Sequence, residues 1–180
     1  MHASVCDIIA DLAQNAIEAD ATRIEVDVAT DPAEIRVRIQ DNGKGMDERT
    51  LAKAKDPFYS EPGKHDRRRV GLGIPLLMQT ASAVGGTVDI QSTPGKGTCV
   101  SFTLDARHLD TPPFGDLPET FLGLMTFGGS YDLILTRTTP NDNYTVSRGE
   151  LIDTLGNLEE IDNLILARAY VRSQEENLNL

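Results

Sequence analysis

Asp41 and the glycines beside it are the first residues in this sequence whose types and spacing could do chemistry. They lie in "VRIQDNGKGMD", residues 37–47, where an alternating strand pattern runs into Asp41, Asn42 and Gly43 and then reaches Gly45. Asn and Gly tolerate positive φ, so the stretch suits a hairpin turn. Glycine also lets the backbone come close to a ligand. The stretch alone leaves both a turn and a ligand site open.

A second pair of candidates, Asp11 and Asn15, lies on a predicted helix over residues 4–20. The apolar residues of this segment follow helical spacing, which predicts one buried face. Asp11 and Asn15 are four positions apart, so they lie one turn apart on the same polar face. Such a pair could bind a ligand together, and a solvated helix face is the plain alternative.

A basic segment, "GKHDRRR" at residues 63–69, stands out because the formal net charge of the chain is −11. It is either a solvated loop or a local site for an anion. Directly after it, "GLGIPLL" predicts a glycine-led helix over residues 71–86. The free N–H groups at the start of a helix bind phosphate groups. The two features together make this part of the chain a candidate anion site.

The other patterns place these candidates on a small α+β framework. Proline and glycine in "RHLDTPPFGDLPE", residues 107–119, mark a linker, so we expect one domain over residues 1–107 and a helix-strand-helix extension over 108–180. Alternation predicts strands and helical periodicity predicts helices. The expected strands cover 22–30, 34–40, a hairpin over 87–105, and 131–139; the further helices cover 47–55, 119–127, and one long or two shorter helices within 147–178.

Bulk composition narrows the class of protein. The acidic net charge argues against non-specific binding of nucleic acid or of anionic membranes. No apolar run approaches the roughly 20 residues of a membrane span, and the first residues lack the pattern of a signal peptide. We therefore expect a cytoplasmic protein with no nucleic-acid or membrane partner.

The order of these motifs resembles the ATP-binding domain shared by sensor histidine kinases, DNA gyrase, heat-shock chaperones and mismatch-repair proteins, the Bergerat or GHKL fold. The matching segments are "DLAQNAIEADATRIEV", "DNGKGM", "DPFYS", "RVGLGIPLL" and "STPGKGTCVSF", and they span about residues 1 to 105. The resemblance implies a two-layer α/β sandwich, with a mixed, mainly antiparallel sheet and helices on one face. It also implies ATP and Mg²⁺ as ligands.

The resemblance assigns a role to each candidate residue. Asp41 would accept a hydrogen bond from the adenine amino group, and Asn15 would hold Mg²⁺. Asp11 matches the acidic position that activates the attacking group in hydrolysing members, where Glu is common, so its shorter reach is in question. Met46 either lines the purine pocket or packs in the core. The other implied ATP contacts are Gly43, Gly45, Lys64, Arg67, Gly71, Leu72, Gly73 and Thr98.

Two branches of this family share features with the sequence. "DATRIEV" resembles mismatch-repair ATPases, whereas "DPFYS", "GLGIPLL" and "STPGKGTCVSFTL" resemble histidine kinases. We favour the kinase branch because three segments indicate it. No phosphoacceptor histidine followed by an acidic residue stands upstream of Asn15. We therefore expect no autophosphorylation by the usual route and an acceptor on another chain.

Three functions remain open at this point. The chain could be a kinase that acts on a partner protein, an ATPase switch with Asp11 as the base, or a non-catalytic regulator that works through residues 108–180. The spacing of Leu and Ile in "LIDTLGNLEEIDNLILARAYV" predicts an amphipathic helix. This segment either extends the core of the first domain or binds a partner, and a homodimer is one such arrangement.

Overall fold

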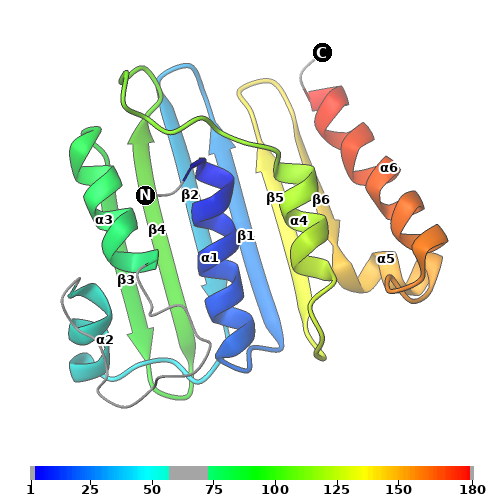
Figure 1. Ribbon diagram of the computed structural model, residues 1–180, viewed down its shortest axis with the longest axis horizontal. Coiled ribbons are helices and arrows are strands. Elements are labelled where there is room, and N and C mark those ends of the chain that lie inside the picture. Colours follow the sequence, from blue (N-terminus) through cyan, green and yellow to red (C-terminus); the bar gives the residue numbers. More distant parts are fainter. Residues whose placement is uncertain (1–2, 57–72, 179–180) are drawn as a thin grey trace.

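The computed structural model describes residues 3–56 and 73–178, which form a six-stranded sheet with helices (Figure 1). The strand order is β3-β4-β2-β1-β5-β6. The strands are β1 (Arg23–Thr30), β2 (Glu34–Asp41), β3 (Thr87–Thr93), β4 (Gly97–Asp105), β5 (Asp132–Thr138) and β6 (Asn143–Ser147). The helices are α1 (Val5–Glu18), α2 (Glu48–Lys55), α3 (Gly73–Ala83), α4 (Leu117–Met125), α5 (Arg148–Leu155) and α6 (Ile161–Leu178).

The sheet is mixed but mainly antiparallel. Strands β1 and β2, β2 and β4, β3 and β4, and β5 and β6 pair antiparallel, while β1 and β5 pair parallel. Helices α1, α3 and α4 lie on one face of the sheet, with α1 in contact with both of the others (Figure 1). This arrangement confirms the predicted α+β, two-layer architecture. None of the described helices is long and apolar enough to cross a membrane.

Helix α1 is favoured by a capped N-terminus and by an apolar face. Ser4 caps it: its hydroxyl accepts from the Asp7 N–H, and the Asp7 carboxylate accepts from the Ser4 N–H. One apolar face is buried against the sheet and the neighbouring helices. The opposite face is polar, and it carries the candidate residues Asp11 and Asn15. The buried residues of the helix are Val5, Cys6, Ile8, Ile9, Leu12, Ala13 and Ala16.

The end of β2, the start of β4 and the end of α1 come together at one end of the sheet. Gln40 of β2 lies opposite Cys99 of β4, so Asp41 lies next to the first residues of β4. The Asn42 side chain accepts hydrogen bonds from the N–H groups of Thr22 and Arg23, which tie this corner to β1. The fold thus assembles three separate motifs at a single corner.

The C-terminal segment differs from its predicted pattern. Residues 143–147 form strand β6, which the sequence did not predict. The last helical region is divided into α5 and α6, which is the two-helix alternative of the sequence prediction. Helix α4 begins at Leu117, inside the stretch expected to be a linker. Strands β5 and β6 continue the same sheet beyond β1, so this segment extends the core. The division at residue 107 stays a prediction.

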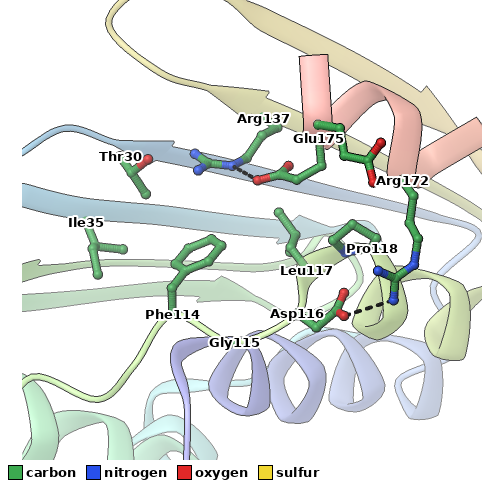
Figure 2. Close-up of a pocket in the computed structure, with 11 residues that line it drawn as sticks. Thr30, Ile35, Phe114, Gly115, Asp116, Leu117, Pro118, Arg137, Arg172 and Glu175 are labelled. Atoms are coloured by element: carbon green, nitrogen blue, oxygen red, sulfur yellow. Dashed lines mark hydrogen bonds and ion pairs between the residues drawn. The ribbon is translucent and has the colours of Figure 1, made fainter. Parts of the chain in front are cut away.

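A buried ion pair fastens helix α6 to this extension. Arg137 of β5 is 5% exposed, and its Nε lies 3.3 Å from a carboxylate oxygen of Glu175, which is 17% exposed (Figure 2). The Tyr144 hydroxyl donates to the other oxygen of Glu175 at 2.7 Å. The Arg137 guanidinium also donates to the carbonyl of Thr138 at 3.0 Å. These bonds join β5, β6 and α6 into one packed unit.

Candidate functional site

A cavity of about 290 Å³ opens at the corner where β2, β4 and α1 meet. It collects residues from motifs that are far apart in the sequence, namely the polar helix, "DNGKGM" and "STPGKGTCVSF". Its volume is close to the lower end of the range that small-ligand pockets occupy. The lining residues are Leu12, Asn15, Ala16, Glu18, Ala19, Ile39, Asp41, Lys44, Gly45, Met46, Ala54, Ile74, Thr98 and Val100.

Asp41 is the buried carboxylate of this cavity. It is the last residue of β2 and only 9% exposed. It accepts a hydrogen bond from the Gly43 N–H at 2.8 Å and another from the backbone N–H of Thr98. Burial raises the pKa of the Asp41 carboxyl, and these two hydrogen bonds oppose the rise. An ionised carboxylate only accepts hydrogen bonds, so it suits a ligand that presents an N–H group.

Ser92 joins the two sides of the cavity. Its hydroxyl accepts from the Met46 N–H at 2.8 Å and lies 2.9 Å from the Thr98 hydroxyl. Met46 and Thr98 both line the cavity, although they are far apart in the sequence. For Met46, the sequence left a pocket position and a core position open, and the structure places it in the pocket wall, half-buried.

Gly43 and Gly45 are needed first for packing against the protein's own backbone. A Cβ at Gly43 would lie 2.6 Å from the Ala19 carbonyl oxygen. A Cβ at Gly45, where φ is +62°, would lie 2.0 Å from the Thr93 carbonyl oxygen. Only Gly45 of the two lines the cavity. At these two positions, the space beside each glycine is therefore filled largely by the protein's own backbone and not by a ligand.

Replacing Gly45 by alanine is expected to lower the free energy of unfolding by about 2 kcal/mol or more, since it combines a left-handed φ with a backbone collision. Gly95 is the matched control, because its φ is +73° but nothing lies within 4 Å of the added Cβ. Gly95→Ala should lose only about 1 kcal/mol. Urea unfolding of both variants makes the comparison, and equal losses would contradict the packing role.

Asp11 and Asn15 face the start of helix α3. A Cβ built on Gly73, the first residue of α3, would lie 3.6 Å from the Asp11 Cβ and 3.9 Å from one of its carboxylate oxygens. It would lie 3.9 Å from the Asn15 amide nitrogen. Asn15 also lines the cavity, so it stands between the Asp41 corner and the N–H groups at the start of α3. The predicted residues Asp11, Asn15 and Gly73 thus lie close together.

Four of the predicted contacts lie outside the described residues: Lys64, Arg67, Gly71 and Leu72. Of the predicted set, the described ones that line the cavity are Asn15, Asp41, Gly45, Met46 and Thr98. Gly43 is hydrogen-bonded to Asp41, and Gly73 and Asp11 adjoin Asn15. The site residues predicted within the described ranges therefore form one continuous region.

The apolar walls of the cavity were not identified as site residues from the sequence. Leu12, Ile39, Ile74 and Val100 line it, and their periodicity had indicated only that they point into the core. Lys44 also lines it, and nothing in its type distinguished it from a surface lysine of a turn. The backbone of Lys44 links α1 to the β3–β4 turn through Ala19 and Gly95.

A second, larger cavity of about 550 Å³ lies away from this corner, around the Arg137–Glu175 pair (Figure 2). Phe114 stacks under the Arg137 guanidinium, whose central carbon lies 5.0 Å from the ring centroid. Both charged groups already have protein partners. The buried charges of the larger cavity pair with each other, which gives that cavity a structural explanation.

The raised pKa of Asp41 predicts a pH dependence of stability. Ionisation of this buried group opposes folding, so its favourable contribution is complete below its ordinary pKa of 3.8 and is lost as the pH rises through the raised folded value. Asp41→Asn should therefore gain stability relative to the wild type over that window and keep the gain at neutral pH. Urea midpoints between pH 3 and 7 measure this, and a wild type that gains on the variant as the pH rises would contradict it.

Comparison with known proteins identifies relatives for most of the chain. It is 33% identical over 150 residues to the sensor protein TorS of Escherichia coli, covering 83% of this chain and 15% of that protein. It is 30% identical over 99 residues to the sensor histidine kinase YxdK of Bacillus subtilis, covering 53% of this chain and 30% of that one. The chain thus spans less than a third of the length of these relatives.

A solved structure shares the fold. The crystal structure of the N-terminal domain of a DNA repair protein superimposes with a TM-score of 0.56 at 13% identity, covering 86% of this chain and 57% of that one. The family described as histidine kinase-, DNA gyrase B- and HSP90-like ATPase matches residues 3–108. These residues include every described member of the predicted site. The chain therefore belongs to this ATPase family and is an ATP-binding, histidine-kinase-like domain.

Proposed function

We propose that the chain binds ATP with Mg²⁺ in the Asp41 cavity and phosphorylates a partner protein. The observation that carries the binding site is the buried Asp41 carboxylate, held by Gly43 and Thr98 at the wall of an apolar cavity. It would accept from the adenine amino group and disfavour guanine, which presents a carbonyl at that position. The apolar walls would cover the two faces of the base.

The triphosphate would extend from the adenine toward the start of α3. The free N–H groups there suit phosphate oxygens, and Gly73 leaves the helix start open. The Asn15 amide oxygen is a suitable ligand for Mg²⁺, which commonly keeps waters and phosphates as its other ligands. The bound ion would neutralise phosphate charge. Lys64, Arg67, Gly71 and Leu72 remain part of this proposal as further phosphate contacts.

The position of His108 supports transfer to another molecule. It is the only histidine among the described residues. It lies just after the last residue of β4, whereas Thr98 lies near the first residue of that strand. At about 3.3 Å per residue, the strand separates Thr98 from Asp105 by roughly 23 Å, and His108 lies in the turn after Asp105. A γ-phosphate held at α3 would not reach it.

A signalling role and a cytoplasmic location remain parts of the same proposal.

Transfer in trans can be tested with γ-labelled ATP and Mg²⁺. The purified chain is incubated with proteins that co-purify with it, and label on a partner is expected with the wild type and not with Asp41→Asn. Label that appears on the partner equally with both proteins would contradict the proposal. Label on the chain itself, with none passed on, would contradict the acceptor assignment while leaving ATP binding intact.

A second candidate, an ATPase switch, is supported by the position of Asp11. Its carboxylate lies beside the start of α3, where it could accept a proton from a water that attacks the γ-phosphate to give ADP and phosphate. Phosphate release that falls at least about 100-fold in Asp11→Asn, with ATP binding retained, would favour this candidate. ATP-dependent complex formation without turnover would favour a non-catalytic regulator.

A further inference from the structure

Ser92 of β3 stands behind the wall of the Asp41 cavity and does not line it. It lies opposite Thr98 of β4, which does line the cavity, so the two side chains lie on the same face of the sheet. The half-buried Ser92 hydroxyl accepts from the Met46 N–H at 2.8 Å. It also lies 3.2 Å from the Gly97 carbonyl oxygen and 2.9 Å from the Thr98 hydroxyl. Ser92 is therefore placed to act on the cavity through residues that line it.

The single proton of the Ser92 hydroxyl decides how these contacts are made. A serine hydroxyl donates one hydrogen bond and accepts two, and the Met46 N–H uses one of the acceptor positions. If Ser92 donated to the Thr98 hydroxyl, its contact with the Gly97 carbonyl would contain no proton. All the contacts form together when Ser92 donates to the Gly97 carbonyl and the Thr98 hydroxyl donates to Ser92.

This arrangement leaves the Thr98 hydroxyl oxygen with only lone pairs to offer a ligand. Its proton is used on Ser92, which is the only hydrogen-bond partner of that hydroxyl within the described residues. The backbone N–H of Thr98 donates to the Asp41 carboxylate, which also only accepts when it is ionised. Both side chains at this wall of the cavity are then acceptors. Such a wall suits a ligand that presents N–H groups and opposes one that presents a carbonyl.

We propose that Ser92 is a positioning residue: it fixes the Thr98 hydroxyl as an acceptor, and the cavity thereby selects a base with an amino group over one with a carbonyl. The inference rests on the proposed ATP site and adds to it a determinant of base selectivity besides Asp41. Alanine at position 92 would free the Thr98 proton to turn toward a ligand carbonyl. Selectivity would then fall although every residue that lines the cavity is unchanged.

Titration calorimetry with Mg-ATP and with the magnesium salt of inosine triphosphate tests this inference, because inosine carries a carbonyl where adenine has its amino group. In Ser92→Ala, the preference for ATP should fall about fivefold to tenfold, the effect of one neutral hydrogen bond gained by the carbonyl. Ser92→Thr keeps a hydroxyl and should keep the preference. In a Thr98→Val background, Ser92→Ala should change the preference no further, since Ser92 acts through the Thr98 hydroxyl.

Amide hydrogen exchange of the ligand-free protein tests the Ser92 contact itself. The Met46 N–H should exchange faster in Ser92→Ala, where it loses its acceptor, and at the wild-type rate in Ser92→Thr. Ser101→Ala is the matched control, because Ser101 is also half-buried in the sheet but does not line the cavity. It should match the wild type in both measurements.

The outcomes separate this inference from the proposed function. A wild type that binds ATP, together with a Ser92→Ala variant that weakens equally toward both nucleotides, overturns the inference alone and leaves Ser92 a purely structural role. Unchanged exchange of the Met46 N–H in Ser92→Ala also overturns it. A wild type that binds neither nucleotide contradicts the proposed ATP site, and the inference with it.

Discussion

Replacing Asp41 by asparagine is expected to weaken ATP binding by about 100-fold. The carboxylate would accept a charge-assisted hydrogen bond from the adenine amino group, and such bonds contribute about 1.5–3 kcal/mol. Asparagine keeps the shape, but its amide can turn an N–H group toward the amino group of the base. Displacement of a fluorescent ATP analogue measures the affinity of both proteins.

This variant separates binding from folding. Because burial raises the pKa of the Asp41 carboxyl, loss of its charge should not destabilise the protein at neutral pH. A lower affinity in a protein that melts no earlier than the wild type is therefore the expected combination. Lys96→Ala serves as the control, since Lys96 is exposed in the nearby β3–β4 turn and is not among the residues that line the cavity. Unchanged ATP affinity in Asp41→Asn would remove Asp41 from the site.

Replacing Glu175 by alanine is expected to lower the free energy of unfolding by about 3–5 kcal/mol. The change leaves the Arg137 guanidinium, which is 5% exposed, without its carboxylate partner. It also takes away the acceptor of the Tyr144 hydroxyl. Burial and the neighbouring Glu175 both raise the pKa of Tyr144. Chemical denaturation followed by circular dichroism gives the difference.

Arg172→Ala is the matched control for Glu175→Ala, because Arg172 also lies on α6 and pairs with acidic residues of the next helix. Its ion pairs with Asp116 and Glu119 are half exposed, so water and salt compensate for most of their loss. Little change in stability is expected. If both variants lose the same amount, the buried pair has no special role in fastening α6.

Local patterns predicted the first part of the fold well, because each element there has a clear period and a marked end. The apolar residues of helix α1 recur at helical spacing, and those of the strands around Val26 and Val37 alternate with polar residues. Both patterns match the faces that are buried. Strand β6 was missed because "NYTVS" has only five residues, of which Tyr144 and Val146 alone are large and apolar. Its place in the sheet depends on β5, and hence on a parallel pairing with β1 that joins distant parts of the chain.

The site was predicted in its polar residues and not in its apolar walls. Asp41 stood out because the glycines after it suit a turn or a close approach of the backbone to a ligand, and Asn15 stood out because it lies one turn from Asp11 on a polar helix face. Ile39 and Val100, by contrast, look like any core residue. The buried partnership of Arg137 and Glu175 had no sequence signal, because 38 residues separate them. Likewise, periodicity predicted that α6 is amphipathic but not that Ile165 and Leu166 would remain exposed.

The central claim is that the corner around Asp41 is an adenine-specific ATP site, and calorimetric titration of wild-type protein with Mg-ATP tests it most directly. Mg-GTP is titrated in parallel. We expect one ATP bound per chain and GTP binding at least about tenfold weaker, since the guanine carbonyl would face the Asp41 carboxylate. No heat of binding with ATP, or equal affinity for the two nucleotides, would contradict the account.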